Sequence, residues 1–238
     1  MMFFILDKKK LMYISLIFVL TLFAGIIGVK AVVPSVRRDI CVIIDAGHGE
    51  PDGGCVGALG TVEQKINLSV ARKISEILEA KNIRTIMTRD SGLGLWTKKS
   101  TTIREKKIED MQNRRRIMEE SRSDLFISIH MNSYSGSGAK GHRVFYDTNH
   151  PHIKDLAENI EARLSDITGE ENYSVKPCER NLFLLKNTPI PAILVECGFL
   201  SNPRDEEKLN TSEHQSKLAW AISDAIEKYY LHQGVNQK

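Results

Sequence analysis

The sequence lacks several features by which common protein classes are recognised. It has no internal repeat, and no pair of its four cysteines has zinc-knuckle spacing. Its 33 Lys and Arg residues against 30 Asp and Glu residues leave a net charge of only +3, without a long basic stripe interleaved with aromatic residues. These absences argue against a repeat protein, a cysteine-based zinc module and nucleic-acid binding.

Cysteine is scarce, at four residues in 238: Cys41, Cys55, Cys178 and Cys197. An even number of cysteines in an exported chain would permit disulfides. However, Cys41 and Cys197 lie within apolar, strand-like runs, where a free cysteine behaves as a small hydrophobic residue. We therefore predict that the cysteines are mostly free and structural.

The N-terminal region combines a positive cluster with a long apolar run. Lys8, Lys9 and Lys10 precede an uncharged run over residues 11–29, close to the ~20 residues that cross a bilayer as a helix. The lysines are predicted to stay inside. Val29-Lys30-Ala31 resembles a signal cleavage site, whereas the length of the run favours an uncleaved anchor. We predict a membrane anchor or signal segment over residues 1–31, with the anchor preferred, and export of the rest of the chain.

The remaining residues are predicted to form a single domain of the α/β class. Residues 32–39 have the composition of a linker, residues 40–232 are predicted to form the folded domain, and residues 233–238 a tail. Short β-branched runs alternate with helical patterns, and this alternation predicts a mostly parallel sheet with helices on both faces. The predicted strands are 40–45, 84–88, 125–130, 143–146, 182–185 and 192–196. The helical patterns cover 66–78, 108–118, 156–164 and 218–229.

Four chemically useful side chains lie where predicted strands end or a helix begins. His48 follows the first strand, His130 ends a later strand, and Glu196 ends the last one. Glu63 begins a helix, where Thr61-Val-Glu-Gln64 fits the capping-box pattern. Because ligands bind beyond the carboxyl ends of strands in open α/β sheets, we expect all four groups on one rim.

Each of these residues also has an ordinary structural interpretation. A histidine in a loop is usually solvated, a histidine ending a strand is usually a satisfied core residue, and a glutamate at a helix start stabilises the helix dipole. Glu196 directly follows a buried strand, where a carboxylate must be paired, protonated or functional, and where burial raises its pKa. Together, two His and one Glu can hold zinc with a position open for water, while a further Glu moves protons.

The motifs around these residues resemble those of a known family. They are Ile44-Asp-Ala-Gly-His-Gly, Glu63-Gln-Lys-Ile-Asn-Leu, Asp124-Leu-Phe-Ile-Ser-Ile-His-Met-Asn and Pro191-Ala-Ile-Leu-Val-Glu-Cys-Gly-Phe-Leu-Ser-Asn. In this order, the region from residue 40 to about 230 resembles the zinc-dependent N-acetylmuramoyl-L-alanine amidases of the type 3 family. The resemblance implies a six-stranded α/β sheet of the phosphorylase/hydrolase-like kind.

The resemblance also implies roles for individual residues. His48, Glu63 and His130 would bind zinc, and Glu196 would be the catalytic carboxylate. The substrate would be peptidoglycan, cleaved at the amide between the lactyl group of muramic acid and L-alanine. Residues 103–114 look like the germination-specific, spore-cortex subgroup (the CwlD type), which implies a step before muramic-δ-lactam formation and a location in the forespore or spore envelope.

Two other functions remain open from the sequence. One is a zinc peptidase or carboxypeptidase on a related scaffold, and the other is a membrane-tethered wall-binding protein whose zinc is only structural. The need for an accessory protein is also left open. We interpret the run Arg114-Arg115-Arg116 as a solvated helix face. The remaining histidines have no ligand-like setting and are interpreted as surface residues: His142, His150, His152, His214 and His232.

Overall fold

A mostly parallel six-stranded sheet forms the centre of the computed structural model, which describes residues 39–135, 138–171, 173–178 and 182–236. The strands lie in the order β2-β1-β3-β6-β4-β5. β1, β2, β3 and β6 pair in parallel, and β4 runs antiparallel to β6. The strand bounds are β1 Cys41–Ala46, β2 Arg84–Met87, β3 Leu125–Asn132, β4 Arg143–Tyr146, β5 Lys176–Pro177 and β6 Ala192–Phe199.

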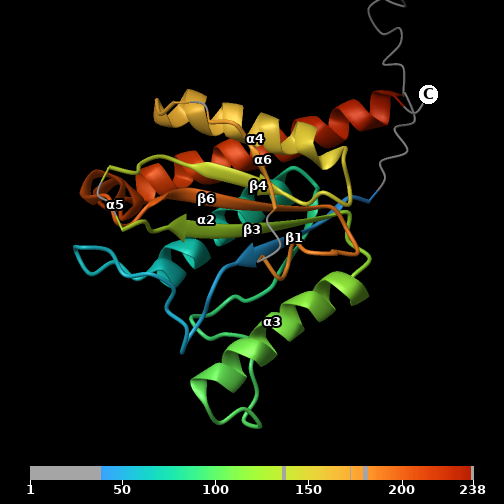
Figure 1. Cartoon of the computed structure of the whole chain (residues 1–238). Coiled ribbons are helices and arrows are strands. Elements are labelled where there is room, and N and C mark those ends of the chain that lie inside the picture. The colour runs from blue at the N-terminus through green and yellow to red at the C-terminus, as the bar shows by residue number, and fades with distance from the viewer. Residues whose placement is uncertain (1–38, 136–137, 172, 179–181, 237–238) are drawn as a thin grey trace, which may run out of the picture. The chain divides into compact units, whose positions relative to one another are not determined.

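The described part of the chain contains five helices, which lie on both faces of the sheet as predicted. Figure 1 shows α3 on one side and α4 and α6 on the other. α2 packs on β1, β2 and β3 as well as on α6. The helix bounds are α2 Glu63–Ala80, α3 Ile103–Glu120, α4 Ile153–Thr168, α5 Pro203–Leu209 and α6 Ser212–Asn236. The predicted single-domain α/β fold is thereby confirmed.

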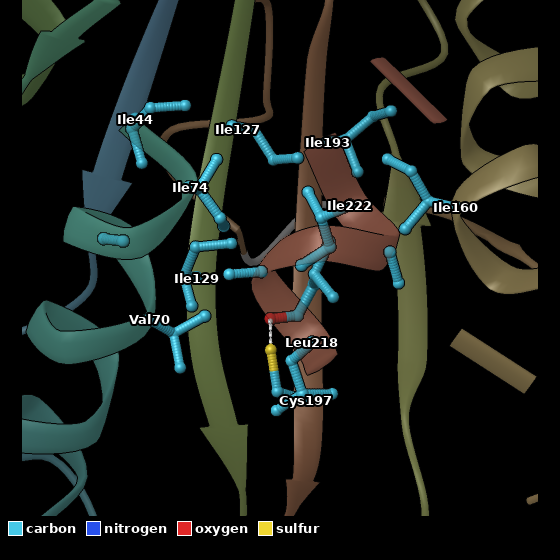
Figure 2. Close-up of a cluster of buried hydrophobic side chains, with 14 of the residues drawn as sticks. Ile44, Val70, Ile74, Ile127, Ile129, Ile160, Ile193, Cys197, Leu218 and Ile222 are labelled. Atoms are coloured by element: carbon cyan, nitrogen blue, oxygen red, sulfur yellow. Dashed lines mark hydrogen bonds between the residues drawn. The ribbon is translucent and has the colours of Figure 1, made fainter. Parts of the chain in front are cut away.

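The larger hydrophobic cluster lies between the sheet and helices α2, α4 and α6. Figure 2 shows Ile44, Ile127, Ile129 and Ile193 of the strands beside the apolar side chains of these helices. Because side chains alternate along a strand, the intervening positions face α3. A second, smaller cluster occupies that face: Ile43, Met118, Phe126, Leu184, Leu185, Ala192 and Leu194. By the same alternation, Asp45, Ser128, His130 and Glu196 also lie on the α3 face.

The strand predicted over residues 182–185 was wrong. These residues form a turn, in which the backbone amides of Leu185 and Lys186 both donate to the carbonyl of Leu182. Leu184 and Leu185 are buried against the α3 face of the sheet. The apolar pattern therefore marked a buried loop, and the edge strand is instead the two-residue β5.

The helix starting at Glu63 was predicted correctly, but its capping box was not. Its N-cap is Val62, and no side chain caps it. The first amides instead donate to a neighbouring loop, from Glu63 to the carbonyl of Cys55 and from Gln64 to that of Gly53. Loop carbonyls therefore take the place of a side-chain cap at the start of this helix.

The predicted anchor or signal segment, residues 1–31, lies outside the described residues, as does most of the predicted linker. Within the described ranges, no helix is long and apolar enough to cross a membrane. The prediction that the cysteines are mostly free is confirmed, since Cys41, Cys55 and Cys197 carry free thiols.

Candidate metal centre and catalytic carboxylate

His48, Glu63 and His130 meet at the carboxyl edge of the sheet, as predicted. Their ligand atoms all lie within 4.8 Å of one another. Oε1 of Glu63 is 3.2 Å from Nε2 of His48 and 3.0 Å from Nδ1 of His130. The two imidazole rings stand nearly perpendicular, with centroids 4.9 Å apart. One carboxylate oxygen thus lies between two ring nitrogens.

Glycines allow this close approach. A Cβ atom on Gly47 would lie 2.3 Å from the His130 ring, and one on Gly54 would lie 2.4 Å from Oε2 of Glu63. His48 itself has a φ of 62°, a conformation uncommon for residues other than glycine. The glycine-rich segment after β1 is therefore required for the histidine and the carboxylate to converge.

The Glu63 carboxylate is buried and accepts several hydrogen bonds. Backbone amides of Cys55 and Met131 donate to it at 2.9 and 3.2 Å, and the Asn67 side chain donates at 3.2 Å. Burial raises its pKa, but hydrogen bonds from His130 and His48 outweigh burial and hold the pKa far below its usual range. The Glu63 carboxylate is therefore negatively charged at neutral pH.

A second carboxylate orients His48. Oδ2 of Asp52 is 3.1 Å from Nδ1 of His48, and Lys107 of α3 pairs with the other oxygen of Asp52 at 2.9 Å. Burial lowers the pKa of His48, but Asp52 and Glu63 together raise it to about 9. Asp52 was not found from the sequence, although a carboxylate four residues after a candidate ligand was the available signal.

The donor set fits a zinc ion. Two imidazole nitrogens and one carboxylate oxygen form a His₂Glu set, which in zinc hydrolases leaves the fourth position for water or substrate. Metal-bound histidines commonly donate their other ring nitrogen to a carboxylate, and Asp52 occupies that place for His48. His48, Glu63 and His130 are thus the residues that would hold the metal.

Glu196 lies beside this set through strand register. It pairs with His130 across β3 and β6, and Figure 1 shows the two strands side by side. In the described part of the chain its Oε2 atom is buried without a hydrogen-bond partner. Burial raises the pKa of Glu196 to about 7. A carboxyl group with such a pKa can both accept and return a proton near neutral pH.

The interpretation of Arg114 as a solvated residue was wrong. Its side chain is 1% exposed, and it ion-pairs with Asp45 of β1 and with Asp110 one turn earlier in α3. It also donates to the carbonyls of Ala46 and His48. The buried residues of α3 are Asp110, Arg114 and Met118, whereas Ile108 is 49% exposed.

The neighbouring arginines and Ser128 differ from Arg114. Arg115 donates to loop carbonyls of Phe183 and Lys186, whereas Arg116 is exposed as expected. Ser128, two residues before His130, donates to Asp45 at 2.6 Å. Arg114 and Ser128 therefore both bind the Asp45 carboxylate.

The interpretation of His142 as a surface residue was wrong, and His214, placed at the surface as well, is half-buried. His142 is buried, and its Nε2 is 3.1 Å from Oε1 of Glu161 and 3.2 Å from Oγ of Ser165. His150 is half-buried against Asp147, and His152 is exposed. None of the described histidines besides His48 and His130 joins the metal-ligand set.

The site combines a His₂Glu set with a buried glutamate whose pKa is raised, and it lies on the rim of an α/β sheet. Metal-assisted hydrolases use the same types of residue. The family model described as N-acetylmuramoyl-L-alanine amidase matches residues 42–228. The chain belongs to this amidase family.

Individual relatives agree with this assignment. The chain is 30% identical over 193 residues to the germination-specific N-acetylmuramoyl-L-alanine amidase of Bacillus subtilis, covering 81% of each protein. It is 35% identical, with a TM-score of 0.77, to the solved CwlD amidase from Clostridioides difficile in complex with the GerS lipoprotein, covering 80% of this chain and 98% of that one. The catalytic domain of CwlV, from Bacillus (Paenibacillus) polymyxa var. colistinus, is 27% identical with a TM-score of 0.68, covering 80% and 98%.

Proposed function

We propose that the chain is a zinc-dependent amidase that hydrolyses the amide between the lactyl group of muramic acid and L-alanine in peptidoglycan. The observation that carries the proposal is the convergence of His48, Glu63 and His130 beside Glu196. Family membership supports the same bond specificity. The peptidase alternative has no comparable support from the relatives.

A zinc ion held by His48, Glu63 and His130 would supply Lewis acidity, lowering the pKa of water and polarising the amide carbonyl. Glu196 then acts as general base, taking a proton from water as the water oxygen bonds to the carbonyl carbon. As the carbon–nitrogen bond breaks, Glu196 returns that proton to the leaving nitrogen. The products are a free lactyl carboxyl group and a peptide with a free amino terminus.

Residues behind the site hold these groups in place. Asp52 fixes the Nδ1 side of His48, so that Nε2 faces Glu63. Arg114 joins Asp45 to the carbonyls of Ala46 and His48. Catalytic groups need placement to within about 0.5 Å, and these contacts fix the loop that carries the first histidine.

The biological proposal follows from the relatives. One relative is named as germination-specific, which supports a role in spore-cortex maturation before muramic-δ-lactam formation. We propose that the enzyme works on the outer face of a membrane, in the forespore or spore envelope, through its N-terminal segment. The CwlD neighbour was solved in complex with a lipoprotein, and the proposal includes a lipoprotein partner for this chain.

The decisive experiment uses the full chain, purified in detergent, with muropeptides and added zinc. Mass spectrometry should detect a free lactyl carboxyl group and an intact peptide beginning with alanine. Release of a C-terminal amino acid would instead identify a carboxypeptidase. The wild-type protein could also bind zinc and yet cleave no muropeptide, either alone or with its candidate lipoprotein partner. That result would support a wall-binding module with a structural metal.

A further inference from the structure

Arg143 lies next to Glu196 on the side opposite His130. In the sheet, β6 lies between β3 and β4, and Glu196 pairs in register with His130 on one side and with Arg143 on the other. Residues directly opposite each other on neighbouring strands share a face of the sheet. A metal ligand, the proposed acid–base group and a guanidinium-bearing residue therefore form one row across the α3 face.

The Arg143 side chain is held in place by aromatic rings. Its guanidinium carbon lies 3.5 Å from the centroid of Tyr173 and 5.5 Å from that of Phe199. Nη1 donates to the backbone carbonyls of Lys140 and His142. Stacking and these bonds orient the group and leave its other nitrogens available, since the described residues provide no acidic partner within 4.0 Å.

The nearby lysines differ from Arg143 in this respect. Lys140 and Lys208 both pair with Glu170, at 3.6 and 2.9 Å. Arg143 is half-buried and thus carries an oriented positive charge that the described residues leave uncompensated. A planar guanidinium in such a position suits a carboxylate, which it can bind through two parallel hydrogen bonds.

We infer that Arg143 binds a carboxylate of the substrate peptide and so determines specificity. The inference rests on the proposed function, in which the lactyl side of the amide lies at the metal ligands and Glu196 protonates the leaving nitrogen. The peptide then extends from Glu196 away from His130, toward β4. Neighbouring strands are about 4.8 Å apart and one extended residue spans about 3.4 Å, so the carboxylate of the second peptide residue comes within reach of Arg143.

The test compares an acidic ligand with its neutral counterpart. The probes are L-alanyl-D-glutamic acid with its γ-carboxyl group blocked as the methylamide, which keeps one free α-carboxylate, and the corresponding α-amide, which has no carboxylate. Each is titrated calorimetrically into the full chain with zinc. The wild type should bind the acid more tightly than the amide, and Arg143→Gln should weaken binding of the acid by roughly 10- to 100-fold, as for loss of a charge-assisted pair. Binding of the amide should change little. Arg143→Lys keeps the positive charge but cannot donate two parallel hydrogen bonds. Its affinity for the acid should therefore lie between those of the wild type and Arg143→Gln.

Arg84→Gln is the matched control, because Arg84 is exposed at the opposite end of the sheet. Zinc content and circular dichroism verify that each variant is folded. An equal affinity of the wild type for acid and amide, or an unchanged preference in Arg143→Gln, overturns the inference. A wild type that cleaves no muropeptide contradicts the proposed function instead, so the two failures are distinguishable.

Discussion

Arg114 and Asp45 form a fully buried ion pair beside the turn that carries His48. Asp45 also accepts hydrogen bonds from Ser128 and Thr88, at 2.6 and 2.7 Å. Burial raises the pKa of Asp45, but Arg114 and these bonds outweigh burial and lower it. The pair links α3 to the ends of β1 and β3, and thereby to the loop of the candidate metal centre.

Removing one partner of this ion pair should destabilise the folded protein. Arg114→Gln leaves Asp45 charged and buried, and we expect the free energy of unfolding to fall by about 3–5 kcal/mol. Denaturant unfolding of the single and double variants measures this. Because Arg114→Gln combined with Asp45→Asn removes both charges of this pair, the double variant should lose less than the sum of the single losses. Additive losses would contradict the coupling, and Arg116→Gln, at an exposed position, is the control.

Asp52 should tighten zinc binding without touching the metal. Asp52→Asn weakens the acceptor that orients His48, and loss of such a partner typically costs 10–100-fold in metal affinity. Competition with a chromogenic chelator measures the affinity directly. Asp155→Asn, an exposed substitution in the first turn of α4, should leave it unchanged. Equal zinc affinities in the Asp52→Asn variant and the wild type would show that the contact has no positioning role.

The parts of the fold and site that could be predicted were those with a strong local pattern. The strands that became β1, β3 and β6 are apolar runs, and their ends carried His48, His130 and Glu196 to one rim because parallel strands share an edge. Glu63 was placed correctly at a helix start. These positions follow from periodicity and topology, without any knowledge of individual contacts.

The burial of individual polar residues could not be predicted, because it depends on partners that are distant in the sequence. Arg114 lies in a run of three arginines, and its buried contacts with β1 and the following turn, including the ion pair with Asp45, distinguish it from Arg116. His142 is likewise buried because Glu161 lies opposite it. Residues 182–185 have a strand-like composition, yet they close a turn over the α3 face. Each of these errors involved a tertiary partner that local sequence does not identify.

Glu206 should stabilise the loop between β1 and α2. Its buried carboxylate accepts bonds from the amides of Leu59 and Thr61, and Gly57 packs against it so closely that a Cβ there would lie 2.2 Å from Oε1. We expect Glu206→Gln to lower the free energy of unfolding by about 1.5–3 kcal/mol. Chemical denaturation at pH 7 measures the loss, with Glu207→Gln, an exposed neighbour, as control.

The pH dependence provides a second check on Glu206. Although burial raises its pKa, the amides of Leu59 and Thr61 lower it more. A carboxylate with a lowered folded pKa contributes stability above its unfolded pKa and loses that contribution as pH falls. The difference between wild type and Glu206→Gln should therefore shrink below about pH 4.5. A difference that is constant with pH would contradict the assigned role of the charge.

Glu196 should control the pH profile of the amidase. Burial raises its pKa to about 7, and the proposed mechanism requires its deprotonated form to accept the proton from water. The pKa of about 7 is that of the metal-free site, and a zinc ion at His48, Glu63 and His130 would lower it by its positive charge. We therefore expect kcat/KM to fall as pH decreases through a value below about 7. The check is to measure the initial rate of muropeptide cleavage at a series of pH values from 5 to 9 and to plot kcat/KM against pH.

Substitution of Glu196 tests the same role from the other direction. Glu196→Gln preserves size but can accept no proton, and we expect kcat to fall by about 10²–10⁴-fold while zinc content stays at the wild-type level. In the metal-free protein, a raised folded pKa makes the carboxyl group stabilising below its unfolded pKa and costly as pH rises through about 7. Metal-free Glu196→Gln should therefore be more stable than metal-free wild type at pH 8 and equal to it near pH 4. Full activity of the variant would rule out Glu196 as the proton carrier, whatever its stability.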